Sequence, residues 1–294
     1  MSHRTKVWTA LWAVYIIWGS TYLAIKLTVE TIPPLLAVST RFILAGSIMA
    51  AIVLWRGGSL RVSRRALGSC VLIGVLLPGA NAVLFFAERD VPTGLASLLI
   101  ASVPLWVVLL RLVARERMPA AALAGVGVGF AGVAVLVRPS GGATALGIGL
   151  CIVSAVMWSV GSFAAARVTM PENPLTATTY EMLAGGLVML PLGLLTAGSL
   201  SPSTSSILAW AYLVTFGSVV GYTAYSWLLH HAPLGTVSTY AYVNPVVAIV
   251  LGVVFLDEIL SAQMLAGAAI VVVAVAVVVR REPPVATQPE EGVR

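Results

Sequence analysis

Long apolar runs recur along the 294-residue chain at near-even spacing, and they constrain its fold more than any motif. We place ten of them, each long enough to cross the hydrocarbon core of a bilayer as a helix. Their approximate bounds are 7–26, 35–54, 67–87, 93–112, 120–137, 145–165, 177–196, 207–228, 236–256 and 263–280. Turn residues and charges separate most of the runs, as at Ile32-Pro33-Pro34. The sequence therefore predicts an all-α integral membrane protein with ten transmembrane helices.

The composition excludes most other classes of protein. Hydrophobic residues make up 59% of the chain, charged residues only 10%, and the mean hydropathy is +1.00. An average soluble domain has about 25% charged residues. Ten spans of about 20 residues take up roughly 200 residues, so the remainder holds no sizeable soluble domain. We expect the lipid bilayer as a partner, and no nucleic acid, because the chain has no soluble surface to bind it.

The sequence lacks the motifs of common catalytic and metal sites. Lysine occurs only at Lys6 and Lys26, so there is no Walker A loop, and the three histidines form no HExxH zinc motif. A Gly-x-Ser-x-Gly nucleophile elbow is also missing. Cys70 and Cys151 lie inside apolar runs, where we interpret them as small buried hydrophobes. We therefore predict that the protein is not an enzyme and has no cofactor and no metal site.

Basic residues predict how the chain is oriented in the membrane, because cytoplasmic loops carry an excess of Lys and Arg. With the N-terminus inside, only Arg89 and Arg138 fall in outer segments. Those in inner segments are Arg4, Lys6, Arg56, Arg61, Arg64, Arg65, Arg111, Arg115, Arg117, Arg167, Arg280 and Arg281. This bias predicts a multi-pass protein with both termini in the cytoplasm. Residues 282–294 hold no long apolar run, and we expect them to form a disordered cytoplasmic tail.

The chain also repeats itself, with an offset of 139 to 142 residues between matching positions. Trp18 matches Trp158, Pro104 matches Pro245 and Glu116 matches Glu258. The segment around Glu116 is basic and is expected inside, whereas the segment around Glu258 is acidic and is expected outside. Each copy contains five spans, an odd number, so the second copy enters the membrane upside down. We predict two inverted five-helix repeats, at 1–142 and 143–281. This is a transporter architecture, in which one half rocks against the other around a midplane site.

Few ionisable side chains lie within the apolar runs, and each is costly there unless it is paired or hydrated. Arg41 and Glu181 fall near equivalent places in the two repeats. Arg41 is a candidate to face a substrate carboxylate, and Glu181 is a candidate to carry a coupling proton. The alternative for each is pairing with a neighbour near the membrane interface. At the outer ends, we expect Lys26 to be an interfacial lysine or a charge at the outer mouth, and Glu88 to pair with Arg89 or Lys26.

Aromatic and amide side chains inside the runs are further candidates for a substrate pathway. A buried amide needs partners, so it either ties helices together or contacts substrate. These residues are Trp18, Tyr22, Asn81, Trp158, Tyr222, Tyr225, Tyr240, Tyr242 and Asn244. Ordinary helix packing is the alternative for any single aromatic, but the set fits a cavity for a small amphipathic or zwitterionic solute. Pro104 and Pro245 predict mid-span kinks, which either free carbonyls toward that cavity or are static.

Two sequence blocks resemble a known family. The block Trp18-Gly19-Ser20-Thr21-Tyr22-Leu23-Ala24-Ile25-Lys26 is similar to the first-span signature of the EamA family in the drug/metabolite transporter superfamily. The block Ser238-Thr239-Tyr240-Ala241-Tyr242-Val243-Asn244-Pro245-Val246-Val247 resembles the ninth-span block of its YedA-type members. The resemblance covers the whole chain apart from the tail. It implies an inner-membrane transporter, usually an exporter of small metabolites such as amino acids.

Together, the residues and the resemblance favour a secondary transporter of small organic solutes across the cytoplasmic membrane by alternating access, with amino acids or related metabolites as exported substrates. Proton coupling is a further expectation, and the protein is either a monomer or a homodimer. Three alternatives stay open: an uncoupled channel or facilitator, a nucleotide-sugar-type exchanger, and a non-transport membrane subunit. A nucleotide-sugar exchanger would need more basic residues in its cavity than Arg41 and Lys26.

Overall fold

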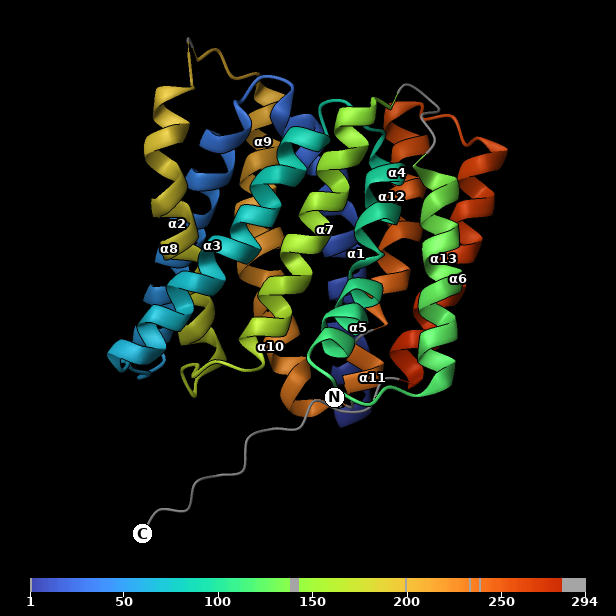
Figure 1. The fold of residues 1–294 in the computed structure, drawn as a ribbon. Coiled ribbons are helices and arrows are strands. Elements are labelled where there is room, and N and C mark those ends of the chain that lie inside the picture. The colour runs from blue at the N-terminus through green and yellow to red at the C-terminus, as the bar shows by residue number, and fades with distance from the viewer. Residues whose placement is uncertain (1, 138–142, 199, 233, 238, 282–294) are drawn as a thin grey trace.

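The computed structural model describes residues 2–137, 143–198, 200–232, 234–237 and 239–281. Within these residues every regular element is a helix (Figure 1). In chain order the elements are α1 (His3–Val29), α2 (Pro34–Trp55), α3 (Arg64–Ala87), α4 (Thr93–Ile100), α5 (Val103–Val113), α6 (Ala120–Leu136), α7 (Ala145–Ala165), α8 (Pro174–Leu195), α9 (Thr204–Tyr212), the π-helix η1 (Leu213–Val220), α10 (Gly221–His231), α11 (Leu234–Val237), α12 (Tyr240–Leu256) and α13 (Ala262–Arg281).

Eight helical stretches in the described part of the chain are long and apolar enough to cross a membrane. In this count α4 with α5 forms one stretch, and α9 with η1 and α10 forms another. Two further apolar helices, α6 and α12, are shorter. Each of the ten predicted apolar runs thus coincides with a helix or a series of helices. The protein is an all-helical, multi-pass membrane protein.

Three of the runs are interrupted, which the hydropathy pattern did not predict. The run 93–112 divides at Ala101 and Ser102, just before Pro104 at the start of α5. Proline lacks an N–H and crowds the preceding turn, which disfavours the continuation of α4 through this point as a regular helix. The run 207–228 widens into the π-helix η1, and the run 236–256 divides into α11 and α12. Pro245, in contrast, lies inside the unbroken α12.

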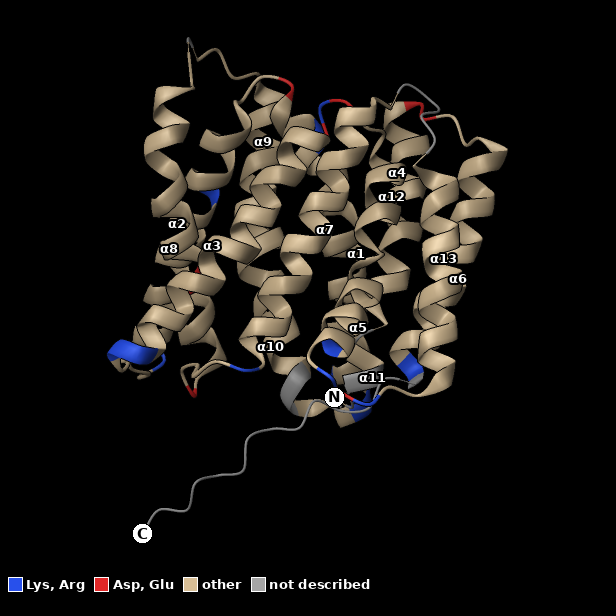
Figure 2. Ribbon diagram, viewed as in Figure 1, with Lys and Arg blue, Asp and Glu red and all other residues tan. Residues whose placement is uncertain are grey.

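The helices run alternately up and down, which gives the bundle two ends (Figure 1). We call the end that holds the chain start and segments 56–63, 114–119 and 166–173 the N-terminal end, and the end that holds 30–33, 88–92 and 257–261 the opposite end. Lys and Arg gather at the N-terminal end and most acidic residues at the opposite end (Figure 2). Charge is therefore sorted along the bundle axis, as the sequence predicted.

Helices distant in sequence form the main packing surfaces. α2 packs along α8, α6 along α13, α3 against α7 and α8, and α1 against α10 and α12. Small residues allow these close approaches in an apolar medium. A Cβ added at Gly132 of α6 would lie only 2.8 Å from Ile270 Cγ2 of α13. Cys70 and Cys151 are buried free thiols, as predicted. The packed helices surround a central space, which holds the candidate site.

Candidate functional site

A cavity of about 150 Å³ lies between the packed helices. Its walls come from α1, α2, α3, α4, α5, α7, η1, α10 and α12 and the turn between α4 and α5, so both halves of the chain contribute to it. Lining residues that the sequence singled out are Trp18, Tyr22, Arg41, Asn81, Pro104, Trp158, Tyr222, Tyr240, Asn244 and Pro245. The fold thus brings together most of the residues predicted for a substrate pathway.

Three predicted residues lie elsewhere. Tyr225 is in a second layer, with its ring centroid 5.1 Å from that of Trp18 and 5.7 Å from that of Tyr240. Tyr242 packs against the main hydrophobic core. Glu181 is half-buried on α8, where its main-chain carbonyl faces Gly74 of α3. None of the three is among the residues that line the cavity.

Sequence reasoning missed several small residues of the cavity wall. Thr21, Ser97, Ser154 and Gly217 are among the residues that line it. Ser154 Oγ donates across to Ala80 O of α3 at 2.7 Å. Small hydroxyl residues are common at helix contacts in membranes, so their residue types gave no signal that would separate a cavity wall from a packing surface.

An aromatic cluster of Trp18, Tyr222, Tyr225 and Tyr240 stands at one side of the cavity, and all of these residues except Tyr225 line it. The Trp18 ring lies edge-on to Tyr222 and Tyr240, with centroids 5.4 and 5.2 Å apart. Trp18 Nε1 also donates to Gly217 O of η1 at 3.2 Å. π-helical turns are rare and occur often at functional sites, because they displace carbonyls from the regular pattern. Trp18 is therefore anchored by main chain from the other half of the molecule, the half that also supplies the three tyrosines.

Arg41 is the charged member of the cavity wall. The residue is only 3% exposed, and its Nε donates to Ser218 Oγ at 3.0 Å. Its Nη1 is buried without a hydrogen-bond partner. Among the described residues no carboxylate lies within ion-pair distance of the Arg41 guanidinium. A buried cation without a counter-ion is costly, so a ligand carboxylate that accepts from this guanidinium would relieve the cost.

The two amides of the cavity wall contact main chain. Asn81 Nδ2 donates to Leu77 O at 3.3 Å within α3. In the amide orientation that satisfies both groups, Asn244 Nδ2 donates to Tyr15 O at 3.3 Å and to Tyr240 O at 3.2 Å. Asn244 therefore ties α12 to α1 beside the cavity.

At the opposite end, side chains of one segment close onto the main chain of another. Glu258, just before α13, accepts from Thr93 N at 2.5 Å and from Gly94 N at 3.0 Å, and so caps α4. Lys26 Nζ donates to the main-chain oxygens of residues 88, 89 and 91 at 2.6, 3.3 and 3.3 Å. The expected pairing of Glu88 with Arg89 or Lys26 is wrong, since neither carboxylate oxygen of Glu88 has a hydrogen-bond partner. Lys26 is therefore held by main-chain carbonyls more than 60 residues away along the chain, which the sequence did not predict.

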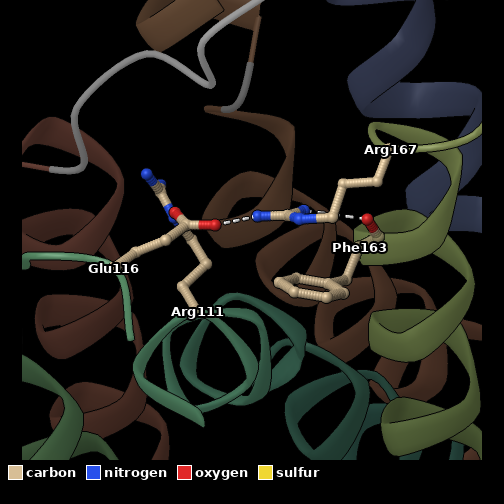
Figure 3. A network of polar contacts seen from close by, with 4 residues as sticks. All are labelled: Arg111, Glu116, Phe163 and Arg167. Carbon is tan, nitrogen blue, oxygen red and sulfur yellow. Dashed lines mark hydrogen bonds and ion pairs between the residues drawn. The ribbon is translucent and has the colours of Figure 1, made fainter. Parts of the chain in front are cut away.

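At the N-terminal end, Glu116 lies between two arginines (Figure 3). Its carboxylate accepts from Arg111 Nε at 2.6 Å and from Arg167 Nη2. Arg167 lies over the Phe163 ring, with its guanidinium carbon 3.5 Å from the ring centroid, and donates to Phe163 O at 2.9 Å. The hydrogen bond from Arg111, with that from Arg167, holds the pKa of the Glu116 carboxyl below its usual range. These contacts tie the α5–α6 connection to the end of α7.

Comparison with known proteins gives four results. The profile of the EamA-like transporter family matches twice, over residues 7–138 and 145–280. The chain is 36% identical over 258 residues to the "Uncharacterized inner membrane transporter YedA" of Escherichia coli (strain K12), covering 86% of this chain and 83% of that one. A "Probable terminal-alkyne amino-acid exporter" of Streptantibioticus cattleyicolor is 28% identical over 272 residues, which cover 90% of this chain and 91% of the relative. A solved crystal structure whose sequence is 26% identical superposes with a TM-score of 0.65, and the match covers 94% of this chain and 96% of the solved one.

Proposed function

Because this chain belongs to the EamA-like transporter family, we propose that it is a secondary transporter that exports amino acids or related small metabolites across the cytoplasmic membrane by alternating access. The family and the similarity to an inner membrane transporter support the membrane and the transport activity. The name of the Streptantibioticus relative supports amino acids as the substrate class.

The observation that carries the proposal is the unpartnered Nη1 of Arg41 in a cavity walled by the aromatic cluster. A free α-carboxylate would accept from Arg41, and the rings of Trp18, Tyr222 and Tyr240 would take an apolar group or, through their faces, the ammonium group. A cavity of about 150 Å³ holds a molecule the size of benzene. This volume and the single arginine disfavour the alternative of a nucleotide-sugar-type exchanger.

We propose that residues 1–142 and 143–281 form two inverted repeats, and the pattern of helix neighbours supports this. In the two repeats α1 corresponds to α7, α2 to α8, α3 to α9 with η1 and α10, α4 and α5 to α11 and α12, and α6 to α13. When each helix is exchanged for its counterpart, the α3–α7 contact becomes the contact of α1 with α9 and α10. The α1–α12 contact maps likewise onto that of α7 with α4 and α5, while α2–α8 and α6–α13 map onto themselves. The two matches of the family profile agree with the same division. Rocking of such halves would expose the cavity to either side in turn.

We propose that the N-terminal end of the bundle faces the cytoplasm. The excess of Lys and Arg at this end supports this orientation (Figure 2). Arg138 and the tail 282–294, both used in the expectation from sequence, lie outside the described residues. The mass of the protein in detergent, corrected for bound detergent, distinguishes a monomer from a homodimer.

Proton coupling is part of the proposal, and Glu181 is the carrier that the sequence suggests. It is half-buried within α8 and outside the cavity wall. If it carries the proton, Glu181→Gln abolishes transport driven by a pH gradient and leaves exchange without a gradient intact. Unchanged driven transport would remove Glu181 from this role, and a wild-type protein indifferent to proton and sodium gradients would be an uncoupled facilitator.

The test of the proposed function is counterflow in proteoliposomes. Vesicles loaded with a mixture of unlabelled amino acids should accumulate labelled amino acids above the level of empty vesicles. Arg41→Met should lose this uptake, and Arg41→Lys should retain part of it, because lysine keeps the charge but not the planar donor pair. Arg65→Met, at an exposed position of the N-terminal end, is the matched control and should transport normally. Folded protein without wild-type uptake would exclude amino acids, and a non-transport subunit would show no flux of any solute.

A further inference from the structure

Glu88 carries a fully buried carboxyl group that has no role in the proposed binding of substrate. It directly follows α3 at the opposite end and is 0% exposed. Both carboxyl oxygens are buried without a hydrogen-bond partner, and so is the neighbouring Thr93 Oγ1. The nearby ammonium of Lys26 contacts main-chain oxygens instead, including Glu88 O at 2.6 Å. Without partners an ionised carboxylate is very costly in such a place, and a protonated carboxyl costs much less.

Titratable and polar groups from four other segments lie near Glu88. From α1 these are Tyr22 and Lys26, from α4 Thr93, from α7 Cys151, and from the segment before α13 Glu258. The next two residues of its own segment, Arg89 and Asp90, are exposed.

Glu258 makes ionisation of Glu88 costly in the closed arrangement. The Glu258 carboxylate is held by two N–H groups at the start of α4, where the helix dipole favours an anion. A second carboxylate beside it would be repelled. Burial, more than any neighbour, raises the pKa of the Glu88 carboxyl well above its usual range.

We propose that Glu88 binds a proton and that this proton is required for the opposite end of the transporter to close. In the open arrangement water reaches the carboxylate, and a proton from that side bonds to one carboxyl oxygen. The neutral carboxyl can then be buried next to Glu258, while Glu258 caps α4 and Lys26 contacts the 88–91 main chain. Loss of the proton would restore two adjacent carboxylates and open this end. Tyr22 contributes to both the cavity wall and the surroundings of Glu88, which places the proton next to the substrate space.

This inference rests on the proposed alternating-access transport, but its test needs no substrate. A reporter cysteine, Val91→Cys, is introduced where the side chain is 1% exposed, in full-length protein with Cys70→Ala and Cys151→Ala. Labelling by a membrane-impermeant maleimide is followed as a function of pH. Rates are divided by those of the exposed Thr31→Cys, which corrects for ionisation of the thiol itself. Below the midpoint, the corrected rate should rise about tenfold for each pH unit, because opening follows the ionised fraction.

Three variants decide the outcome. Glu88→Gln mimics the protonated carboxyl and should label slowly at every pH. Glu88→Asp should keep a pH-dependent rate with a displaced midpoint, which also guards against a failure of Glu88→Gln to fold. Glu30→Gln changes an exposed carboxyl at the same end and should behave as the wild type.

Two results would overturn the proposal. One is a Glu88→Gln protein, folded by its elution profile, that keeps the wild-type pH dependence. The other is labelling that responds to sodium at constant pH and not to pH, which would point to a metal cation. Wild-type counterflow without pH-dependent labelling would refute the role of Glu88 and leave the proposed function standing, whereas pH-dependent labelling without counterflow would refute only the substrate.

Discussion

Glu116 and Glu258 occupy matched positions in the two halves of the sequence, yet they hold the two ends of the bundle by different chemistry. Each follows a residue with left-handed backbone, Arg115 at φ 60° and Asp257 at φ 53°. Each donates its N–H to a carbonyl of the preceding helix, at 2.9 Å for Glu116 and 3.1 Å for Glu258. The local turn is thus the same at both ends. The difference lies in what the carboxylate meets.

Glu258 binds main-chain N–H groups of α4, which lies in the other half, whereas Glu116 binds two guanidinium groups. The side chains of Glu116 and Arg167 are each 32% exposed, so water and salt weaken their ion pair. The carboxylate of Glu258 accepts from the start of a buried helix, and the fully buried Glu88 is its neighbour. The same turn therefore supports a buried closure at one end and an exposed tie at the other. In an alternating-access cycle, that is the asymmetry expected of one of two end states.

The largest expected effect is at the opposite end. Glu258→Ala should lower the free energy of unfolding by about 1 to 3 kcal/mol, because it leaves the N–H groups of Thr93 and Gly94 without their acceptor. The same variant should increase maleimide labelling at Val91→Cys. Thermal unfolding in detergent measures the first effect, and Glu172→Gln, an exposed carboxyl at the N-terminal end, is its control. A stability equal to that of the control would mean that the α4 cap contributes nothing.

A smaller effect at the same end is expected from Lys26→Met. The change removes a donor shared by three carbonyls and should cost about 1 to 2 kcal/mol, since hydrogen bonds from a charged donor are stronger than neutral ones. Lys26→Arg should recover part of the loss. If Lys26→Met and the wild type unfold at the same temperature and label alike, Lys26 is an interfacial lysine only.

At the N-terminal end, Glu116→Gln should cost only about 0.2 to 1 kcal/mol, as for other ion pairs partly exposed to water. Salt should separate the two ends of the bundle further, because it screens the Glu116 ion pairs. In about 1 M NaCl the loss should nearly vanish, because the Debye length falls to about 3 Å. Chemical unfolding at low and high salt measures this. A loss that persists in high salt would show that the tie is buried in the membrane protein, like its counterpart.

The smallest effect is a pH dependence of the same tie. Since the folded pKa of Glu116 lies below its unfolded value, its contribution is fully present above the unfolded value, about 4.3, and is lost as pH falls through the folded pKa. The difference in stability between wild type and Glu116→Gln should therefore shrink below about pH 4. A difference that grows with acidity would contradict the arginine contacts.

Hydropathy alone located the helices, because a bilayer core requires about 20 apolar residues for each crossing. It could not locate the break at Ala101 and Ser102 or the π-helix η1. These features depend on which backbone hydrogen bonds form locally, and a hydropathy average over a whole run does not report them. Residue type likewise singled out Trp18 and Arg41, which both line the cavity, but also Tyr242, which packs in the core. Polar and aromatic residues are unusual in an apolar run whichever way they face.

From the chain alone we could predict that this protein lies in a lipid bilayer, that it is helical, how charge is sorted between its two ends, and which family it resembles. These depend on composition, spacing and residue identity along the chain. Which polar groups find hydrogen-bond partners, in contrast, depends on the fold. Arg41 meets Ser218 across 177 residues, and Lys26 meets the main chain of Glu88 across 62. Such contacts depend on how helices remote in sequence are placed, so the unpartnered guanidinium of Arg41 and the buried carboxyl of Glu88 became visible only in the folded chain.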